Sequence, residues 1–151
     1  MAESELLQRI ITFIRSLGIR VDERAMWRET LVSGIDIENG GLVIEERLLV
    51  KPADLLHEAG HIALTEPAKR AALDGTITSS AAEEIATIAW TWAAAMHLEI
   101  APSEVFHVDV ISGNGPTLLE NFSTGHYVGV PWLQRLKLTT NYPAMTRWVR
   151  E

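Results

Sequence analysis

The stretch from residue 34 to residue 65 reads GIDIENGGLVIEERLLVKPADLLHEAGHIALT and contains the two signals that decide the fold. Residues 34–38 alternate apolar and polar side chains, and Asn39-Gly40-Gly41 is typical of a tight turn between antiparallel strands. Apolar runs at 42–44 and 48–50 have the composition of further strands. We therefore expect a small antiparallel sheet of two or three short strands.

The second half of this stretch predicts a helix over about residues 53–65. Pro52 ends the preceding strand, and Asp54 is placed to stabilise the positive end of the helix dipole. Within the helix, His57-Glu58-Ala59-Gly60-His61 puts two imidazoles four residues apart on one face, where both can bind one metal ion. Glu58 is rotated to the side, where its carboxylate can take a proton from a metal-activated water without binding the ion.

Two further helices flank this region. Apolar residues at helical spacing predict a helix over residues 4–17, which Gly18 ends. A longer helix is expected over about 80–98, with N-cap candidates at 78–80 and Glu83 at the spacing of a capping box. The expected fold is α+β, a mostly helical single domain over residues 1–151 with a small antiparallel sheet.

The composition excludes several classes of protein. The chain has no cysteine, so any metal must be held by His, Asp or Glu, and a cysteine-free chain fits a reducing compartment. Its formal charge of −7 argues against nucleic acid as the partner. The N-terminus lacks a secretory signal, and the longest apolar run, 85–96, is too short to cross a bilayer. We expect a cytoplasmic protein that binds neither nucleic acid nor a membrane.

The HEAGH motif, set between Leu55-Leu56 and Ile62-Ala63-Leu64, resembles that of the zincin superfamily of metallopeptidases. The resemblance extends over residues 34–98 through the order hairpin, motif helix, second helix. It implies an α+β core in which the edge strand of the sheet lines the substrate cleft. It also implies a Zn²⁺ ion on His57 and His61, and hydrolysis of a peptide or protein substrate with Glu58 as general base.

The third zinc ligand sorts zincins into subfamilies. No His lies between His61 and His97, whereas Glu83-Glu84 lie on the next predicted helix, as the ligand does in gluzincins. We prefer Glu84, which borders the apolar stripe of that helix, because Glu83 suits a capping role. Asp74 is the main alternative. The Ala-rich pattern EEIATIAWTWA is also loosely similar to that of ImmA/IrrE-type metallopeptidases.

Candidates for the remaining roles are less specific. A Gly-rich segment at 121–131 carries His126 and Tyr127, either of which can donate a hydrogen bond to an oxyanion. Trp90 and Trp92 are expected in the core, and they can also mark a homodimer surface. The alternative function is a catalytically silent zincin fold that binds or regulates another protein.

Overall fold

The computed structural model describes residues 3–75, 77, 79–106 and 115–151. The chain forms two compact units, which are described here one at a time: Met1–Thr78 with Val149–Glu151, and Ser79–Trp148. The elements are helices and one small sheet, so the α+β class is confirmed. A single domain over 1–151 stays a prediction.

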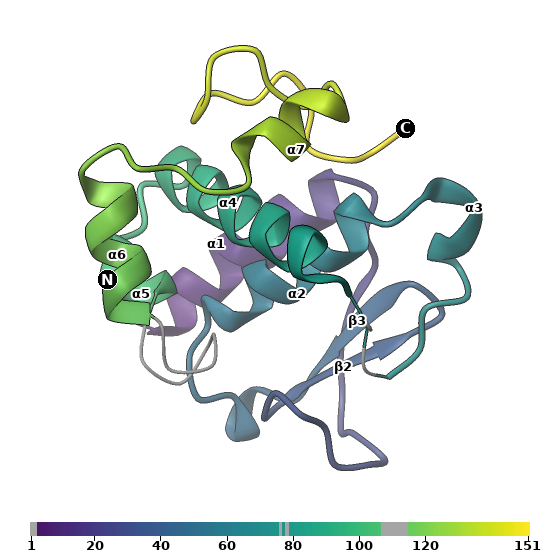
Figure 1. Ribbon diagram of the computed structural model, residues 1–151. Coiled ribbons are helices and arrows are strands. Elements are labelled where there is room, and N and C mark those ends of the chain that lie inside the picture. The colour runs from purple at the N-terminus through teal and green to yellow at the C-terminus, as the bar shows by residue number, and fades with distance from the viewer. Residues whose placement is uncertain (1–2, 76, 78, 107–114) are drawn as a thin grey trace. The chain divides into compact units, whose positions relative to one another are not determined.

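The first unit holds the sheet and the helices that follow and precede it in the chain (Figure 1). In chain order its elements are α1 (Glu3–Ser16), β1 (Val21–Glu23), β2 (Ile35–Glu38), β3 (Gly41–Ile44), the 3-10 turn η1 (Glu46–Leu48), α2 (Asp54–Leu64) and α3 (Pro67–Arg70).

The predicted hairpin is confirmed as β2 and β3, which pair in antiparallel fashion with Ile35 opposite Ile44. Asn39 and Gly40, the two residues between the strands, both have positive φ, 51° and 77°. Paired positive φ angles are the geometry of a type I′ turn, whose twist matches that of the strands. The local turn signal therefore sets the register of the hairpin.

The rest of the sheet differs from the expectation. The strand order is β1-β3-β2, and β1 pairs with β3 in parallel, so the sheet is mixed rather than wholly antiparallel. Residues 48–50 are not a strand, because the chain leaves the sheet at Glu45 and turns through η1. Leu48 and Val50 are exposed, so these apolar side chains do not form the buried face of a strand.

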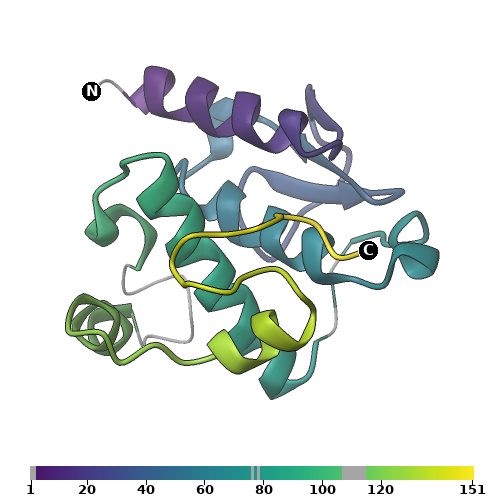
Figure 2. The same ribbon diagram turned by 90° about the horizontal axis from the view of Figure 1, so that it is seen from above.

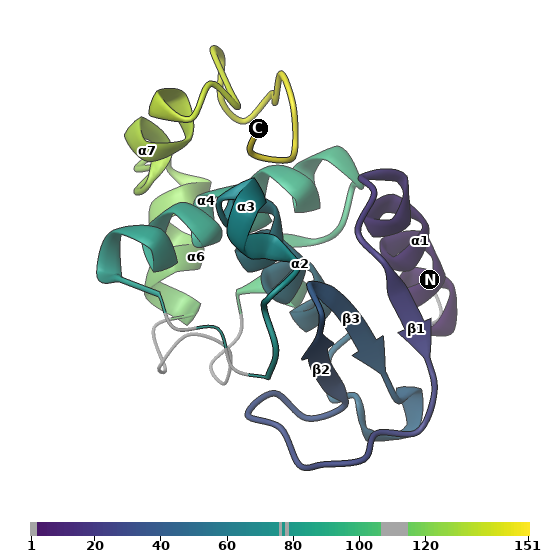
Figure 3. The same ribbon diagram turned by 90° about the vertical axis from the view of Figure 1, so that its right-hand side faces the viewer.

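Two helices cover this sheet. The predicted helix at 4–17 is confirmed as α1, and Gly18 follows it with a φ of +86°. α1 contacts β1 and α2, and α2 contacts β3 (Figure 3). The buried face of α1 is formed by Leu7, Ile10, Ile11 and Ile14. The motif helix is thus held between the sheet and α1.

The second unit is helical. It contains α4 (Ala81–His97), α5 (Pro102–Val105), α6 (Gly115–Ser123) and α7 (Val130–Arg135). The segment after α7, yellow in Figure 2, runs back along α4. There the Tyr142 hydroxyl donates to the Ala89 carbonyl at 2.7 Å, and Trp90 Nε1 donates to the Trp148 carbonyl at 2.8 Å.

Trp90 and Trp92 lie in the core, as expected. Trp90 is fully buried, and the Trp92 ring contacts those of Phe106 and Phe122. Among the described residues, no helix is both long enough and apolar enough to span a bilayer.

Candidate metal centre

The two motif histidines lie together on α2. His57 is buried, with 8% of its surface exposed, and His61 is half-buried. Their ring centroids are 4.8 Å apart and the ring planes are nearly perpendicular, at 88°. The spacing of four residues has therefore brought both imidazoles onto one face, as predicted.

Apolar burial holds α2 in place around this pair. Leu55, Leu56, Ala59, Ile62 and Ala63 are all fully buried. A helix anchored this completely gives the two rings little freedom to separate, because its neighbours are closely packed. Glu58 is half-buried on the same helix, and one residue of rotation turns it about 100° away from His57.

Two arginines stabilise the C-terminal end of α2. Arg70 Nε donates to the Ile62 carbonyl at 3.2 Å, and the backbone N–H of Arg150 donates to the Ala63 carbonyl at 2.9 Å. Burial, and after it the charge of Arg150, lowers the pKa of Arg70. Cations at this end of a helix offset the negative end of its dipole. The sequence analysis missed both arginines: Arg150 comes from a distant part of the chain, and Arg70, eight residues after Ile62, belongs to no motif of α2.

The start of α4 separates the roles of its two acids. Ser80 Oγ accepts from the Glu83 N–H at 3.1 Å, and the Glu83 carboxylate accepts from the Ser80 N–H at 3.1 Å. This capping box confirms the structural role predicted for Glu83. Glu84 is half-buried, and Ser79 Oγ donates to its Oε2 at 3.4 Å. Ser79 was considered only as an N-cap; the structure instead makes it a contact of the preferred ligand.

His57 and His61, both on α2, are possible ligands of one metal ion in the first unit, and Glu84, the preferred third ligand, lies at the start of α4 in the second unit. Two imidazoles bound to one tetrahedral zinc at ~2.0–2.1 Å hold their ring centroids roughly 5 Å apart, close to the separation on α2. Two nitrogens and one carboxylate oxygen are also a donor set that zinc accepts while keeping a fourth position open. The residues therefore fit the ion that the motif implies.

Asp74, the alternative ligand, is engaged elsewhere. Its Oδ1 lies 3.3 Å from Arg28 Nη2, and it does not belong to the group with the two histidines. The interaction with Arg28 accounts for an acid at this position without a metal.

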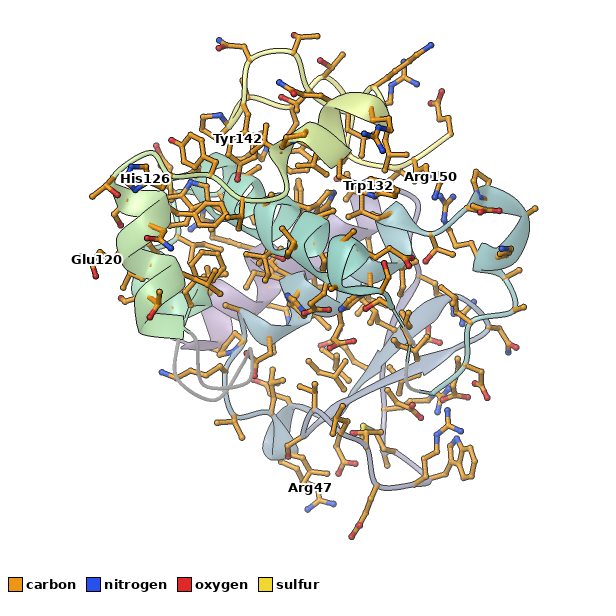
Figure 4. The ribbon with its side chains drawn as sticks, in the orientation of Figure 1. Arg47, Glu120, His126, Trp132, Tyr142 and Arg150 are labelled. Carbon is orange, nitrogen blue, oxygen red and sulfur yellow. The ribbon has the colours of Figure 1, made fainter. Side chains whose placement is uncertain are left out.

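The predicted oxyanion donors lie just after α6. His126 is exposed (Figure 4), and its Nδ1 is 3.4 Å from the Thr124 hydroxyl. The Tyr127 ring contacts Phe122 and Tyr142. Burial, and after it the neighbouring Tyr127, raises the pKa of Tyr142, so that hydroxyl stays protonated as a donor to α4. The donor role of His126 and Tyr127 stays a prediction.

Two histidines, His97 and His107, were assigned no role from the sequence. The His97 ring lies 5.4 Å from the Trp148 ring, a contact that gives it a packing role. His107 lies outside the described residues.

The two imidazoles on α2 have the chemistry to bind a divalent cation, and Glu58 follows His57 on the same helix. Comparison of the chain with protein-family models, curated proteins and solved structures gives no match. The case for function accordingly rests on the residues of this chain alone.

Proposed function

We propose that this chain is a zinc-dependent peptide-bond hydrolase, with His57, His61 and Glu84 as the protein ligands. The observation that carries the proposal is the pair of imidazoles on one face of α2, whose ring centroids lie 4.8 Å apart. A structural zinc site usually has four protein ligands, whereas a catalytic one has three and an open position. Three donors therefore favour catalysis.

Glu58 is the proposed general base. Bound zinc would supply Lewis acidity, polarising the scissile carbonyl and lowering the pKa of water to about 7. Glu58 then accepts a proton from the water that attacks the carbonyl carbon and passes it to the departing amine nitrogen. The peptide C–N bond breaks, a carboxylic acid and an amine form, and Glu58 returns to its starting state.

The alternative is a zincin-like module that binds another protein without catalysis. Such a module gains nothing from a non-ligating carboxylate between the two histidines, so the presence of Glu58 supports the enzyme. We also propose a cytoplasmic location, which the cysteine-free composition supports.

The test measures zinc content and hydrolysis of labelled casein separately. Protein purified without chelator should carry about one zinc per chain. Glu58→Gln should keep that zinc and lose ~10²–10⁴-fold in kcat. Glu66→Gln, which changes an exposed acid paired with Lys69 on α3, is the matched control and should keep both. Absence of zinc, or full turnover by Glu58→Gln, would refute the proposal.

The adjacent acids of α4 provide a second control for the ligand set. Glu84→Gln should weaken zinc binding, because an amide is a poorer ligand than a carboxylate. Glu83→Gln should bind zinc as the wild type does, since that side chain caps the helix. Equal zinc affinity of the two variants would remove Glu84 from the site.

A further inference from the structure

The outer edge of β2 is occupied by the chain itself. All four residues of β2 lie opposite a residue of β3, but only the hydrogen-bonded positions, Asp36 and Glu38, direct their backbone groups toward β3. The backbone groups of Ile35 and Ile37 therefore point to the outer edge. The Ile37 carbonyl accepts from the Gly75 N–H at 2.7 Å, and the Ile35 N–H donates to the Val32 carbonyl at 3.2 Å. An extended peptide that adds to a sheet edge needs such groups for its own hydrogen bonds.

Residues 73–75, which we call the edge strap, make the contact with Ile37. Besides the Gly75 bond, the Leu73 carbonyl accepts from the Gly40 N–H at 2.9 Å, in the turn between β2 and β3. The strap thus follows the hairpin from its turn to the middle of β2. Coverage of an exposed edge by a loop is one way in which proteins block unwanted strand pairing.

Arg28 ties the strap to the strand. Its guanidinium donates to both carboxylate oxygens of Asp36, at 2.8 and 3.1 Å, and to the Ile37 carbonyl at 3.2 Å. The same Nη2 lies 3.3 Å from Asp74 Oδ1 in the strap. Asp36, which is buried, also accepts from the Ile37 N–H at 2.8 Å. Both backbone groups of Ile37 are therefore satisfied within the chain.

We propose that the edge strap is an autoinhibitory contact, and that an extended peptide pairs with β2 only after displacing residues 73–75. The choice of a peptide as the ligand rests on the proposed hydrolysis; the closed edge itself does not. Displacement of the strap frees the Ile37 carbonyl, which can then accept from an N–H of the peptide, while the Ile37 and Ile35 N–H groups keep their bonds to Asp36 and Val32. Among the described residues, Asp74 makes one charged contact, its ion pair with Arg28. We call this ion pair the latch of the strap.

Two variants weaken the strap without touching β2. Asp74→Asn removes the charge from an exposed side chain of the latch. Gly75→Ala strains a backbone whose φ is +74°, while its new Cβ meets nothing closer than Arg28 Nη2 at 3.7 Å. Each change raises the fraction of molecules with an open edge, and apparent affinity rises by the same factor. Asp22→Asn, at another exposed Asp–Arg pair of this unit, is the control.

The experiment uses full-length Glu58→Gln protein, so that the probe is not cleaved, and fluorescein-labelled β-casein as an unfolded polypeptide. Fluorescence anisotropy should show roughly 2- to 5-fold tighter binding for Asp74→Asn and roughly 5- to 30-fold tighter binding for Gly75→Ala. The control should bind as the parent does. The Gly75 amide should exchange faster with solvent as casein is added, because its bond to Ile37 is broken.

Unchanged affinity in both variants, or a Gly75 amide still protected at saturating casein, would refute the proposal that the strap is autoinhibitory. Neither measurement requires metal or turnover. If the protein lacks zinc but the strap variants bind casein more tightly, the proposed hydrolase function is refuted and the autoinhibitory role of the strap is supported. If the wild type carries zinc and is active but the strap variants bind casein as the parent does, the hydrolase function is supported and the role of the strap is refuted.

Discussion

Replacing Gly129 with alanine should destabilise the second unit through a contact that its neighbour in sequence, Gly125, does not make. Both glycines have strongly positive φ, +82° and +84°, so each alanine adopts the left-handed region. A Cβ at Gly129 would lie 2.3 Å from the Ile85 carbonyl oxygen, whereas a Cβ at Gly125 meets nothing within 4 Å. The pair of variants therefore separates backbone strain from steric overlap.

The magnitude follows from these two terms. A left-handed alanine costs about 1–2 kcal/mol, and this is the whole effect expected for Gly125→Ala. Overlap with a helix backbone that cannot rotate away adds about 1–3 kcal/mol, giving roughly 2–5 kcal/mol for Gly129→Ala. The overlap falls on the residue that follows Glu84, so the displaced first turn of α4 should also weaken zinc binding.

Urea denaturation followed by circular dichroism measures the free energy of unfolding, and a zinc titration against a chromogenic chelator measures affinity. Gly125→Ala serves as the matched control in both. If the two variants were equally stable within about 0.5 kcal/mol, the close approach of Gly129 to α4 would be refuted.

Three further changes test other parts of the structure. Ser80→Ala removes the N-cap of α4 and should cost about 1 kcal/mol, measured by urea denaturation. Tyr142→Phe removes the buried hydroxyl bonded to the Ala89 carbonyl and should also cost about 1 kcal/mol, while a fall in stability below 0.3 kcal/mol would contradict that bond. The Met26 N–H, donating to Glu45 at 2.9 Å, lowers the pKa of Glu45, so its ionised form stabilises the fold. The difference in Tm between wild type and Glu45→Gln should thus be full above about pH 4.3 and shrink as the pH falls below it; a difference that grows in acid would reverse the assigned direction.

The Gly-rich segment shows how a correct local signal can have another purpose. Glycines in such a segment can bring the backbone close to another group. Gly129 does bring the backbone into close approach, but the partner is Ile85 of α4. The sequence shows that residue 129 is a glycine, but Ile85, the residue whose backbone leaves no room for a side chain there, lies more than forty residues away in the chain.

The third strand is a similar case. Residues 48–50 have strand composition but are exposed after a turn, and Val21–Glu23, which reads as a short charged segment, pairs with β3. Strand pairing is selected by what the neighbouring backbone offers, and three residues carry too little periodicity to signal it.

The sequence by itself determined the features that depend on residues within about four positions of one another. These are the tight turn of the hairpin, the shared face of His57 and His61, and the capping box that assigns Glu83 a structural role. Their interactions form within a single turn of helix or hairpin, so the local order of side chains suffices.

Only the tertiary structure decided the parallel pairing of β1, the bond of the Arg150 backbone to the end of α2 and the strap that closes the edge of β2. Each joins segments far apart in the chain through backbone hydrogen bonds, which every residue but proline can make as a donor. The amino-acid composition of a segment therefore does not indicate which other segment it will bond to. That pairing is decided when burial of the apolar faces brings the two segments together.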